Sequence, residues 1–102
     1  MSASLDRLSF YVLNALADDW ESLEQIVPHV GRFIGVGDAS HIACVVVELL
    51  SKGLLVEMKH TSLKPHMIVE TPTEYWFSMT SKGRALWEAE SRNLDSGDQQ
   101  TT

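Results

Sequence analysis

Residues 38–59, Asp38-Ala-Ser-His-Ile-Ala-Cys-Val-Val-Val-Glu-Leu-Leu-Ser-Lys-Gly-Leu-Leu-Val-Glu-Met-Lys59, have the pattern of a helix followed at once by a strand. Asp38 is a good N-cap residue, and Gly53 is the residue type that commonly follows a helix end. Apolar residues recur between them at the spacing of one helical face: Ile42, Val46, Leu49 and Leu50. The β-branched residues 45–47 favour a strand weakly. The cap, the length and the glycine together predict a helix over 39–51 and a strand over 54–59.

Two further helices are predicted before this stretch. The first covers residues 4–17, with Ser4 or Ser2 as its cap and an apolar face of Leu5, Leu8, Val12, Ala15 and Leu16. The second covers 23–33 and begins with a capping box of Ser22 and Gln25. Pro28 lacks the N–H that the helix needs, so a kink or an early end is expected there. The glycine-rich residues 31–37 predict a turn, in which Gly35 and Gly37 adopt positive φ.

A second strand and a fourth helix are predicted after it. Residues 75–79 alternate as a strand, with Tyr75, Phe77 and Met79 on one side. Residues 60–74 form a long loop between the strands, and Met67–Val69 extend the hairpin as a short strand. Thr80 caps a helix that begins there. Residues 1–92 are therefore expected to form one domain, and the polar residues 93–102 a disordered tail.

Three helices followed by a β-hairpin and a last helix is the plan of the α+β winged helix-turn-helix. The sequence resembles this superfamily, and most closely its PadR and MarR-like regulators. The similarity spans roughly residues 5–90. Three stretches carry it: Leu13-Asn-Ala-Leu-Ala17, Val46-Val-Glu-Leu-Leu-Ser-Lys-Gly-Leu-Leu-Val56 and Tyr75-Trp-Phe-Ser-Met-Thr-Ser-Lys-Gly-Arg-Ala-Leu-Trp87, in which Met79 replaces the family's leucine.

The resemblance implies a dimeric transcriptional regulator that binds double-stranded DNA. Helix 39–51 would enter the major groove, and the hairpin would lie as a wing over an adjacent groove or the backbone. The residues expected to contact DNA are Ser40, His41, Lys59, His60, Lys64, His66, Lys82 and Arg84.

The distribution of charge leaves a second function open. The net charge is −6, but residues 52–87 contain five basic and three acidic residues, a balance of +2. The outer face of helix 39–51 has none of the Lys, Arg, Asn or Gln side chains best suited to base edges; it consists of Ala39, Ser40, His41, Ala43, Cys44, Val47 and Ser51. This face favours the alternative, a winged-helix protein-interaction module that no longer binds DNA.

Aromatic residues predict an interface between two subunits. The first helix has Phe10, Tyr11 and Leu13 away from its main apolar face, so it is expected to be buried on two sides. Trp76 points away from Tyr75 and Phe77, and tryptophan is common at interface hot spots. The expected dimer contacts are Phe10, Tyr11, Trp76 and Trp87. Trp20 is expected to close the junction of the first two helices.

Other functional classes find little support. No nucleophile elbow, phosphate loop or metal motif occurs, so an enzyme and a cofactor are not expected. His41 and Cys44 lie one turn apart, but zinc needs two further ligands; an inert, buried thiol is favoured. The longest apolar run, residues 42–47, is too short to span a bilayer. The N-terminal residues do not resemble a targeting peptide, and with a single cysteine a cytoplasmic location is expected.

Overall fold

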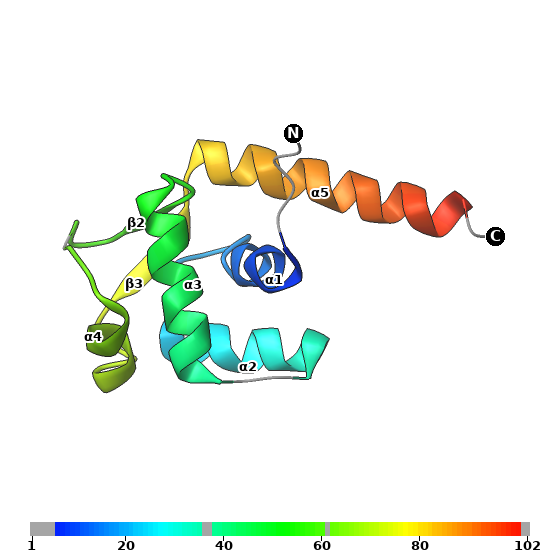
Figure 1. Cartoon of the computed structure of the whole chain (residues 1–102). Helices are drawn as coiled ribbons and strands as arrows, with labels where there is room; N and C mark the ends of the chain where they lie inside the picture. The colour runs from blue at the N-terminus through cyan, green and yellow to red at the C-terminus, as the bar shows by residue number, and fades with distance from the viewer. Residues whose placement is uncertain (1–5, 36–37, 61, 101–102) are drawn as a thin grey trace.

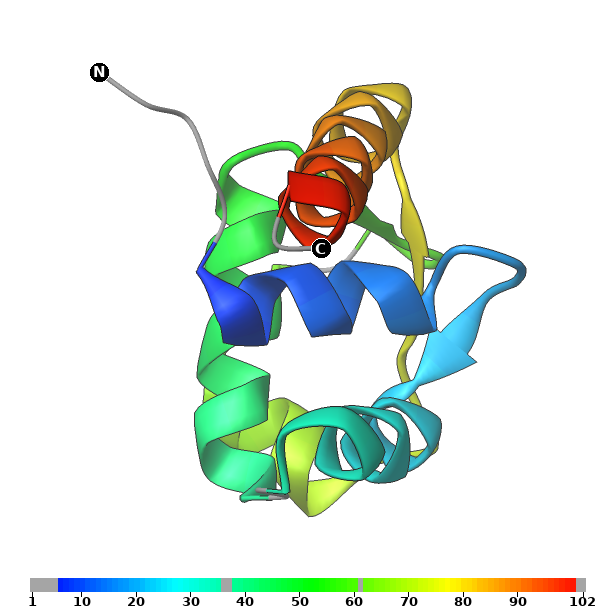
Figure 2. The ribbon, with the colours of Figure 1, turned by 90° about the vertical axis from the view of Figure 1, so that its right-hand side faces the viewer.

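The structure, a computed structural model, describes residues 6–35, 38–60 and 62–100. In this part the chain is α+β, with five helices and a small antiparallel sheet. Its elements follow in the order α1 (Arg7–Ala15), β1 (Glu21–Ser22), α2 (Leu23–Ile34), α3 (Ala39–Ser51), β2 (Leu55–Glu57), α4 (Pro65–Glu70), β3 (Trp76–Met79) and α5 (Ser81–Gln100). Figures 1 and 2 show α1 between α2 on one side and α5 on the other, and in Figure 1 α3, α4 and the strands β2 and β3 lie together on the left.

The sheet has the order β1-β3-β2, so β3 is its central strand. Phe77 of β3 lies opposite Glu57 of β2 on one side and Glu21 of β1 on the other. The pairing of β2 with β3 confirms the predicted hairpin. The strand β1 was not predicted, because two residues are too few to produce an alternating pattern.

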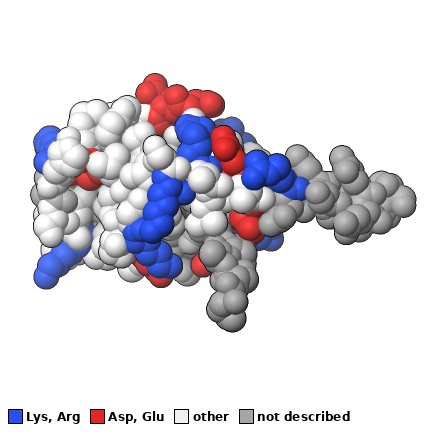
Figure 3. Space-filling model, turned by 90° about the horizontal axis from the view of Figure 1, so that it is seen from above, with Lys and Arg blue, Asp and Glu red and all other residues white. Residues whose placement is uncertain are grey.

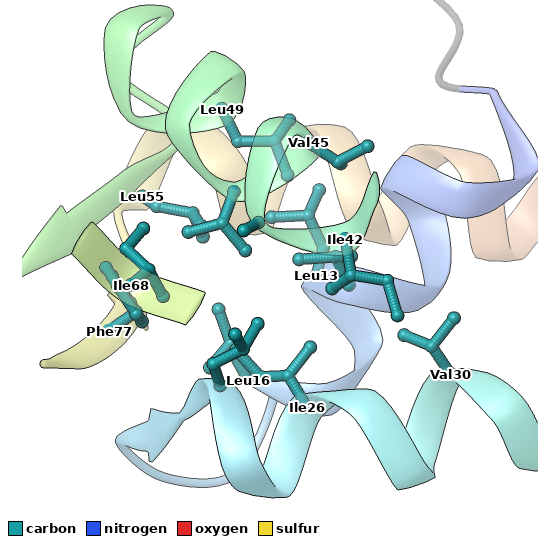
Figure 4. Packing of buried hydrophobic residues seen from close by; sticks show 14 of the residues in the cluster. Leu13, Leu16, Ile26, Val30, Ile42, Val45, Leu49, Leu55, Ile68 and Phe77 are labelled. Atoms are coloured by element: carbon teal, nitrogen blue, oxygen red, sulfur yellow. The ribbon is translucent and has the colours of Figure 1, made fainter. Parts of the chain in front are cut away.

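The core lies between the helices and the sheet (Figure 4). Every helix from α1 to α4 contributes to it, and so do strands β2 and β3. Its fully buried large side chains are Phe77, Leu13, Leu16, Leu23, Ile26, Ile42, Leu49 and Ile68. Leu13 is therefore a core residue, contrary to the expectation that it faces away from the main apolar face of the first helix. That face is wider than the sequence pattern indicated, since α1 is covered by neighbours on more than one side.

The third helix and its ends are confirmed. The helix α3 covers Ala39–Ser51, and the Asp38 carboxylate accepts a hydrogen bond from the backbone N–H of Ser40 at 3.1 Å. Gly53 follows the C-cap Lys52 with φ of +75°. A glycine adopts this left-handed conformation without the steric cost that a Cβ imposes. The chain therefore reverses there and enters β2 directly, as the sequence predicted.

The first two helices begin or end differently from the prediction. Asp6, rather than Ser4 or Ser2, caps α1, and its carboxylate accepts a hydrogen bond from the N–H of Ser9 at 2.7 Å; the two serines lie outside the described residues. The α2 capping box is confirmed, with the N–H of Ser22 donating to Gln25 Oε1 at 2.9 Å.

The glycine-rich turn is shorter than expected. Residues 31–34 still belong to α2, which continues past Pro28. A proline in a helix removes only one hydrogen bond, and packing of Ile26 and Val30 in the core holds the helix together on both sides of it. Gly35 ends α2 with φ of +73°, as predicted. The prediction for Gly37 lies outside the described residues.

The segment between the hairpin strands contains the helix α4, so the short strand expected at Met67–Val69 is wrong. Lys64 is extended, and Pro65 occupies the first turn of the helix, where a missing N–H costs nothing. Ile68 is fully buried against the core, and α4 packs beside α3. Burial of one helical face outweighs the strand preference of the isoleucine and valine.

The last helix continues further than the sequence suggested. The helix α5 ends at Gln100, so residues 93–100, which composition predicts as a disordered tail, continue its backbone. No proline interrupts this stretch. The helix α5 therefore continues without a break through residue 93, where the sequence predicted that the domain ends and a tail begins.

Candidate nucleic-acid interface

The outer face of α3 is polar and exposed at its N-terminal end. Ser40, His41 and Cys44 are exposed, and so is Ser51 one helix length away. Two expectations are wrong here. Ala43 is fully buried in the core rather than on the outer face, and Cys44 is exposed rather than buried. The burial of Ala43 depends on the elements that cover α3, which the sequence pattern does not place, whereas the exposure of Cys44 agrees with its predicted position on the outer face and contradicts only the expectation of a buried thiol.

Two hollows lie along this face of α3. The N-terminal hollow, of about 380 Å³, is lined by residues of α3 and α4: Ser40, Cys44, Pro65, His66, Val69 and Glu70. The C-terminal hollow, of about 360 Å³, is lined by residues of α3, β2 and the loop after it: Val47, Leu50, Ser51, Leu55, Val56, Glu57, His60, Ser62 and Leu63. The segment that follows β2 therefore borders α3 along most of its length.

The N-terminal hollow brings together candidate residues that lie far apart in the sequence. Ser40 and His66 line the same hollow, one from α3 and the other from α4. Lys64 immediately precedes α4 and is exposed, as is His41 beside Ser40. Four of the eight residues expected to contact DNA thus belong to one surface region, hereafter the α3–α4 face: Ser40, His41, Lys64 and His66.

Lys59 and His60 lie at the start of the segment between the strands. Lys59 Nζ is 3.7 Å from the Glu74 carboxylate, and both side chains are at least half exposed, so this pair holds the lysine only weakly. Glu57 is almost fully buried and its Oε2 accepts a hydrogen bond from the N–H of Lys59 at 3.1 Å. His60 has φ of +56° and its N–H donates to the Glu57 carbonyl at 2.9 Å. The buried glutamate thereby shapes the turn that presents Lys59 to solvent.

Lys82 and Arg84 lie outside the α3–α4 face, and each donates a hydrogen bond to a backbone carbonyl. Lys82 Nζ donates to the Lys52 carbonyl at the end of α3, at 3.3 Å. Arg84 donates from Nη2 to the Ala17 carbonyl at 2.7 Å, and its guanidinium lies 5.8 Å from the Trp87 ring centroid. Arg84 is thus held beside the turn that follows α1, not beside α4.

That turn is acidic. Burial, and then the charges of Asp19 and Asp18, raise the pKa of Glu21 above its usual value. Asp18 and Asp19 directly follow Ala17, whose carbonyl accepts from Arg84, so their negative charge weakens any attraction of this arginine for phosphate. Figure 3 shows the upper face, where a band of Lys and Arg side chains crosses the middle, other basic side chains stand apart from it, and Asp and Glu side chains lie among them.

The predicted interface aromatics differ in how much surface they keep. Phe10 is buried within the chain and packs edge-on against Tyr11, at 5.1 Å between ring centroids. Trp76 donates from Nε1 to the Thr73 carbonyl at 3.1 Å, and Trp87 donates to Asn14 Oδ1 at 3.2 Å. Tyr11, Trp76 and Trp87 remain half-buried. Among the residues whose side chains the structure describes, Phe33 and Met58 are the large apolar ones that are exposed, and the sequence pattern did not single them out.

Within the described residues, no three His, Cys, Asp or Glu side chains gather closely enough to hold a metal ion. No single helix there is long and apolar enough to cross a membrane; α2 and α3 reach that length and composition only when counted together across a bend of 106°.

Comparison with known proteins finds no matching family model, no matching curated protein and no matching solved structure. Function is therefore inferred from the residues of this chain and their arrangement.

Proposed function

We propose that this protein is a small DNA-binding transcriptional regulator of the winged-helix kind that acts as a dimer. The observation that supports this most is the α3–α4 face, where Ser40 and His66 line one hollow and His41 and Lys64 stand exposed near them. Hydroxyl and imidazole groups at the start of a helix are suited to base edges, and lysine to phosphate. The α+β arrangement, with α3 leading directly into a hairpin, is compatible with the winged-helix plan.

The few cations near α3 mean that binding would be dominated by a small number of phosphate contacts. Lys59 and Lys64 are exposed near α3, and Lys82 lies at its C-terminal end. Each lysine that neutralises a phosphate contributes about 0.9 to the slope of log affinity against log salt concentration. Affinity should therefore be modest, with a slope of log affinity against log salt concentration of about −2.7 for each subunit engaged and about −5 for a dimer with both subunits on the DNA.

The salt dependence provides a direct test. We expect duplex DNA to bind in fluorescence anisotropy at 50 mM salt, and the Lys64→Ala variant to have a slope about 0.9 shallower than the wild type per subunit engaged. Arg92→Ala, which removes a charge from α5 away from the α3–α4 face, should leave the slope unchanged. Absence of binding by the wild type at low salt, or equal slopes for Lys64→Ala and Arg92→Ala, would contradict the proposal.

A protein-interaction module is the second candidate, and one observation favours it. The helix α3 contains no Lys, Arg, Asn or Gln, and the N-terminal hollow beside it is largely apolar, with Cys44, Pro65 and Val69 in its lining. A hollow of about 380 Å³ has the size of small binding pockets in proteins. On this view α3 and α4 together receive a side chain of a partner protein instead of the edge of a base pair.

One substitution separates the two candidate functions, because each predicts a different effect on DNA affinity and on partner capture. Cys44→Arg adds a cation at an exposed position of α3. If α3 enters the major groove, affinity for duplex DNA should rise about tenfold, which corresponds to one added phosphate or base contact. If the hollow receives a partner protein, DNA affinity should not change and partner capture should be lost. Cys44→Ser, which keeps the size and adds no charge, should match the wild type in both measurements.

A further inference from the structure

Three side chains from three helices form a hydrogen-bonded chain beside the core. Trp87 of α5 donates from Nε1 to Asn14 Oδ1 of α1, at 3.2 Å. Asn14 Nδ2 lies 3.0 Å from Nε2 of His29 on α2. All three side chains are half-buried. Since α1 lies between α2 and α5 (Figures 1 and 2), the Asn14 amide connects the two outer helices.

The direction of these hydrogen bonds follows from the chemistry of the groups. An indole N–H can only donate, so Trp87 requires the oxygen of the Asn14 amide. The amide then presents its NH₂ group to His29. An NH₂ group can only donate, so Nε2 of His29 must be the unprotonated, accepting nitrogen. The observed arrangement therefore needs a neutral imidazole with its proton on Nδ1.

The surroundings of His29 keep the imidazole neutral near pH 7. Burial, and then the positive charge of Arg32 one turn along α2, lower the pKa of His29 below its ordinary value. The ring of Phe33 lies 5.0 Å away, and Tyr11 of α1 stacks on that ring. The residues of α1 that face His29 and Phe33 are Asn14 and Tyr11, and the residue of α5 that reaches Asn14 is Trp87. None of these three side chains carries a charge between about pH 5 and pH 8.

With a proton on Nε2 of His29, the two hydrogen bonds that Asn14 makes to His29 and Trp87 cannot both form. Protonated histidine donates from both nitrogens, so Nε2–H and the NH₂ group of Asn14 would point donor against donor. Rotation of the amide by 180° lets Oδ1 accept from His29 but turns the NH₂ group against the indole N–H of Trp87. Hydrogen bonds to a charged donor are stronger than those between neutral groups. The rotated amide should therefore prevail, and the bond to Trp87 is the one lost.

We propose that the His29–Asn14–Trp87 chain is a proton-sensitive latch, in which protonation of His29 in mild acid turns the Asn14 amide and releases Trp87 of α5 from α1. Arg84 still donates to the Ala17 carbonyl, so α5 stays attached at its first turn while its second turn loosens. The latch does not depend on the proposed DNA binding, because none of its three residues belongs to the α3–α4 face.

The latch is tested by NMR titration of the full chain between pH 8 and pH 5. We expect the Trp87 indole proton and the Asn14 side-chain amide protons to shift with the same midpoint as the His29 ring. His41→Gln, which removes an exposed histidine on α3, should leave all three titrations unchanged. If His29 titrates while Trp87 and Asn14 do not move, or if His29 stays neutral down to pH 5, the proposal is wrong.

Asn14→Asp should reverse the effect of acid. A carboxylate accepts from the indole and from a protonated imidazole at the same time, so no conflict arises. The pKa of His29 should rise. The urea midpoint of this variant should increase as pH falls from 8 to 6, whereas that of the wild type, whose His29 pKa is lowered, should decrease as pH falls below about 6.5. If Asn14→Asp does not fold, His29→Gln provides an acceptor that does not titrate, and Trp87 should then be insensitive to pH. A pH response of Trp87 that persists in His29→Gln would overturn the proposal.

Discussion

Gly83→Ala is expected to lower the free energy of unfolding by about 3 kcal/mol, as overpacking at a close backbone contact does. In an exposed helix interior the same substitution would raise stability by about 1 kcal/mol, because alanine is the better helix former. Gly83 lies in the first turn of α5 and is buried. A Cβ added there would lie on the Leu54 carbonyl oxygen, 3.0 Å from the Leu54 carbonyl carbon and 3.1 Å from Met79 Cγ.

The backbone near Gly83 is held by hydrogen bonds and cannot move aside without breaking them. The Leu54 carbonyl also accepts the N–H of Thr80, at 3.1 Å, and the Thr80 hydroxyl donates to the Gly53 carbonyl at 2.7 Å. Moving α5 to accommodate a methyl group would break these bonds, which join the start of the helix to the turn between α3 and β2. The contact explains why a glycine stands in a helix at a position where helix propensity alone favours almost any other residue.

The control variant for Gly83→Ala is Gly53→Ala. The Cβ added at residue 53 has no atom within 4 Å, but the alanine must adopt φ of +75°. This variant should lose about 1–2 kcal/mol, the cost of the left-handed conformation for a residue with a Cβ. Thermal and urea unfolding should rank the stabilities as wild type, Gly53→Ala, then Gly83→Ala. Stabilisation by Gly83→Ala would mean that α5 does not pack this closely on Leu54.

Phe77→Ala is expected to lower the free energy of unfolding by about 3–5 kcal/mol, the range for removal of a buried aromatic ring. Phe77 is fully buried and lies at the centre of β3, opposite residues of β1 and β2. A domain of this size is stable by only about 5–15 kcal/mol, so the variant should lose a large part of its stability and be close to unfolding at 37 °C.

Two neighbouring variants serve as controls for Phe77→Ala. Phe77→Leu keeps most of the apolar volume and should cost much less, about 1–2 kcal/mol. Ser78→Ala changes the adjacent, half-buried residue of β3 and should alter stability by less than about 0.5 kcal/mol. Urea unfolding followed by circular dichroism measures all three. A loss below about 1 kcal/mol for Phe77→Ala would place the ring outside the core.

Local sequence signals located α3 and the start of α2 well because each of these helix ends has its own chemical cause. The Asp38 cap, the capping box of Ser22 and Gln25, and the positive φ of Gly53 all act within four residues, so they are visible without the rest of the chain. The helix α4 was missed because its short apolar run, Met67–Val69, is equally compatible with a strand. Only its packing against α3 and the core selects the helix.

The candidate site was predictable in its residue types but not in its arrangement. The exposed Ser40 and His41 follow from their place at the start of α3, whereas their meeting with His66 depends on α4. The separate position of Arg84, beside the acidic turn after α1, is likewise a tertiary feature. Their positions in the sequence predicted that the basic residues between 59 and 84 contact DNA on one surface. The packing of α5 on α1 instead places Arg84 apart from the basic residues near α3.

From its sequence alone, this protein is a small α+β chain whose third helix runs into a β-hairpin, because caps, glycines and apolar spacing act over a few neighbouring residues. Only the tertiary structure decided that α4 flanks α3, that Ala43 is buried while Cys44 is exposed, and that Trp87, Asn14 and His29 form one chain. These features depend on residues up to 73 positions apart, and contacts over such distances leave no periodic trace in the sequence.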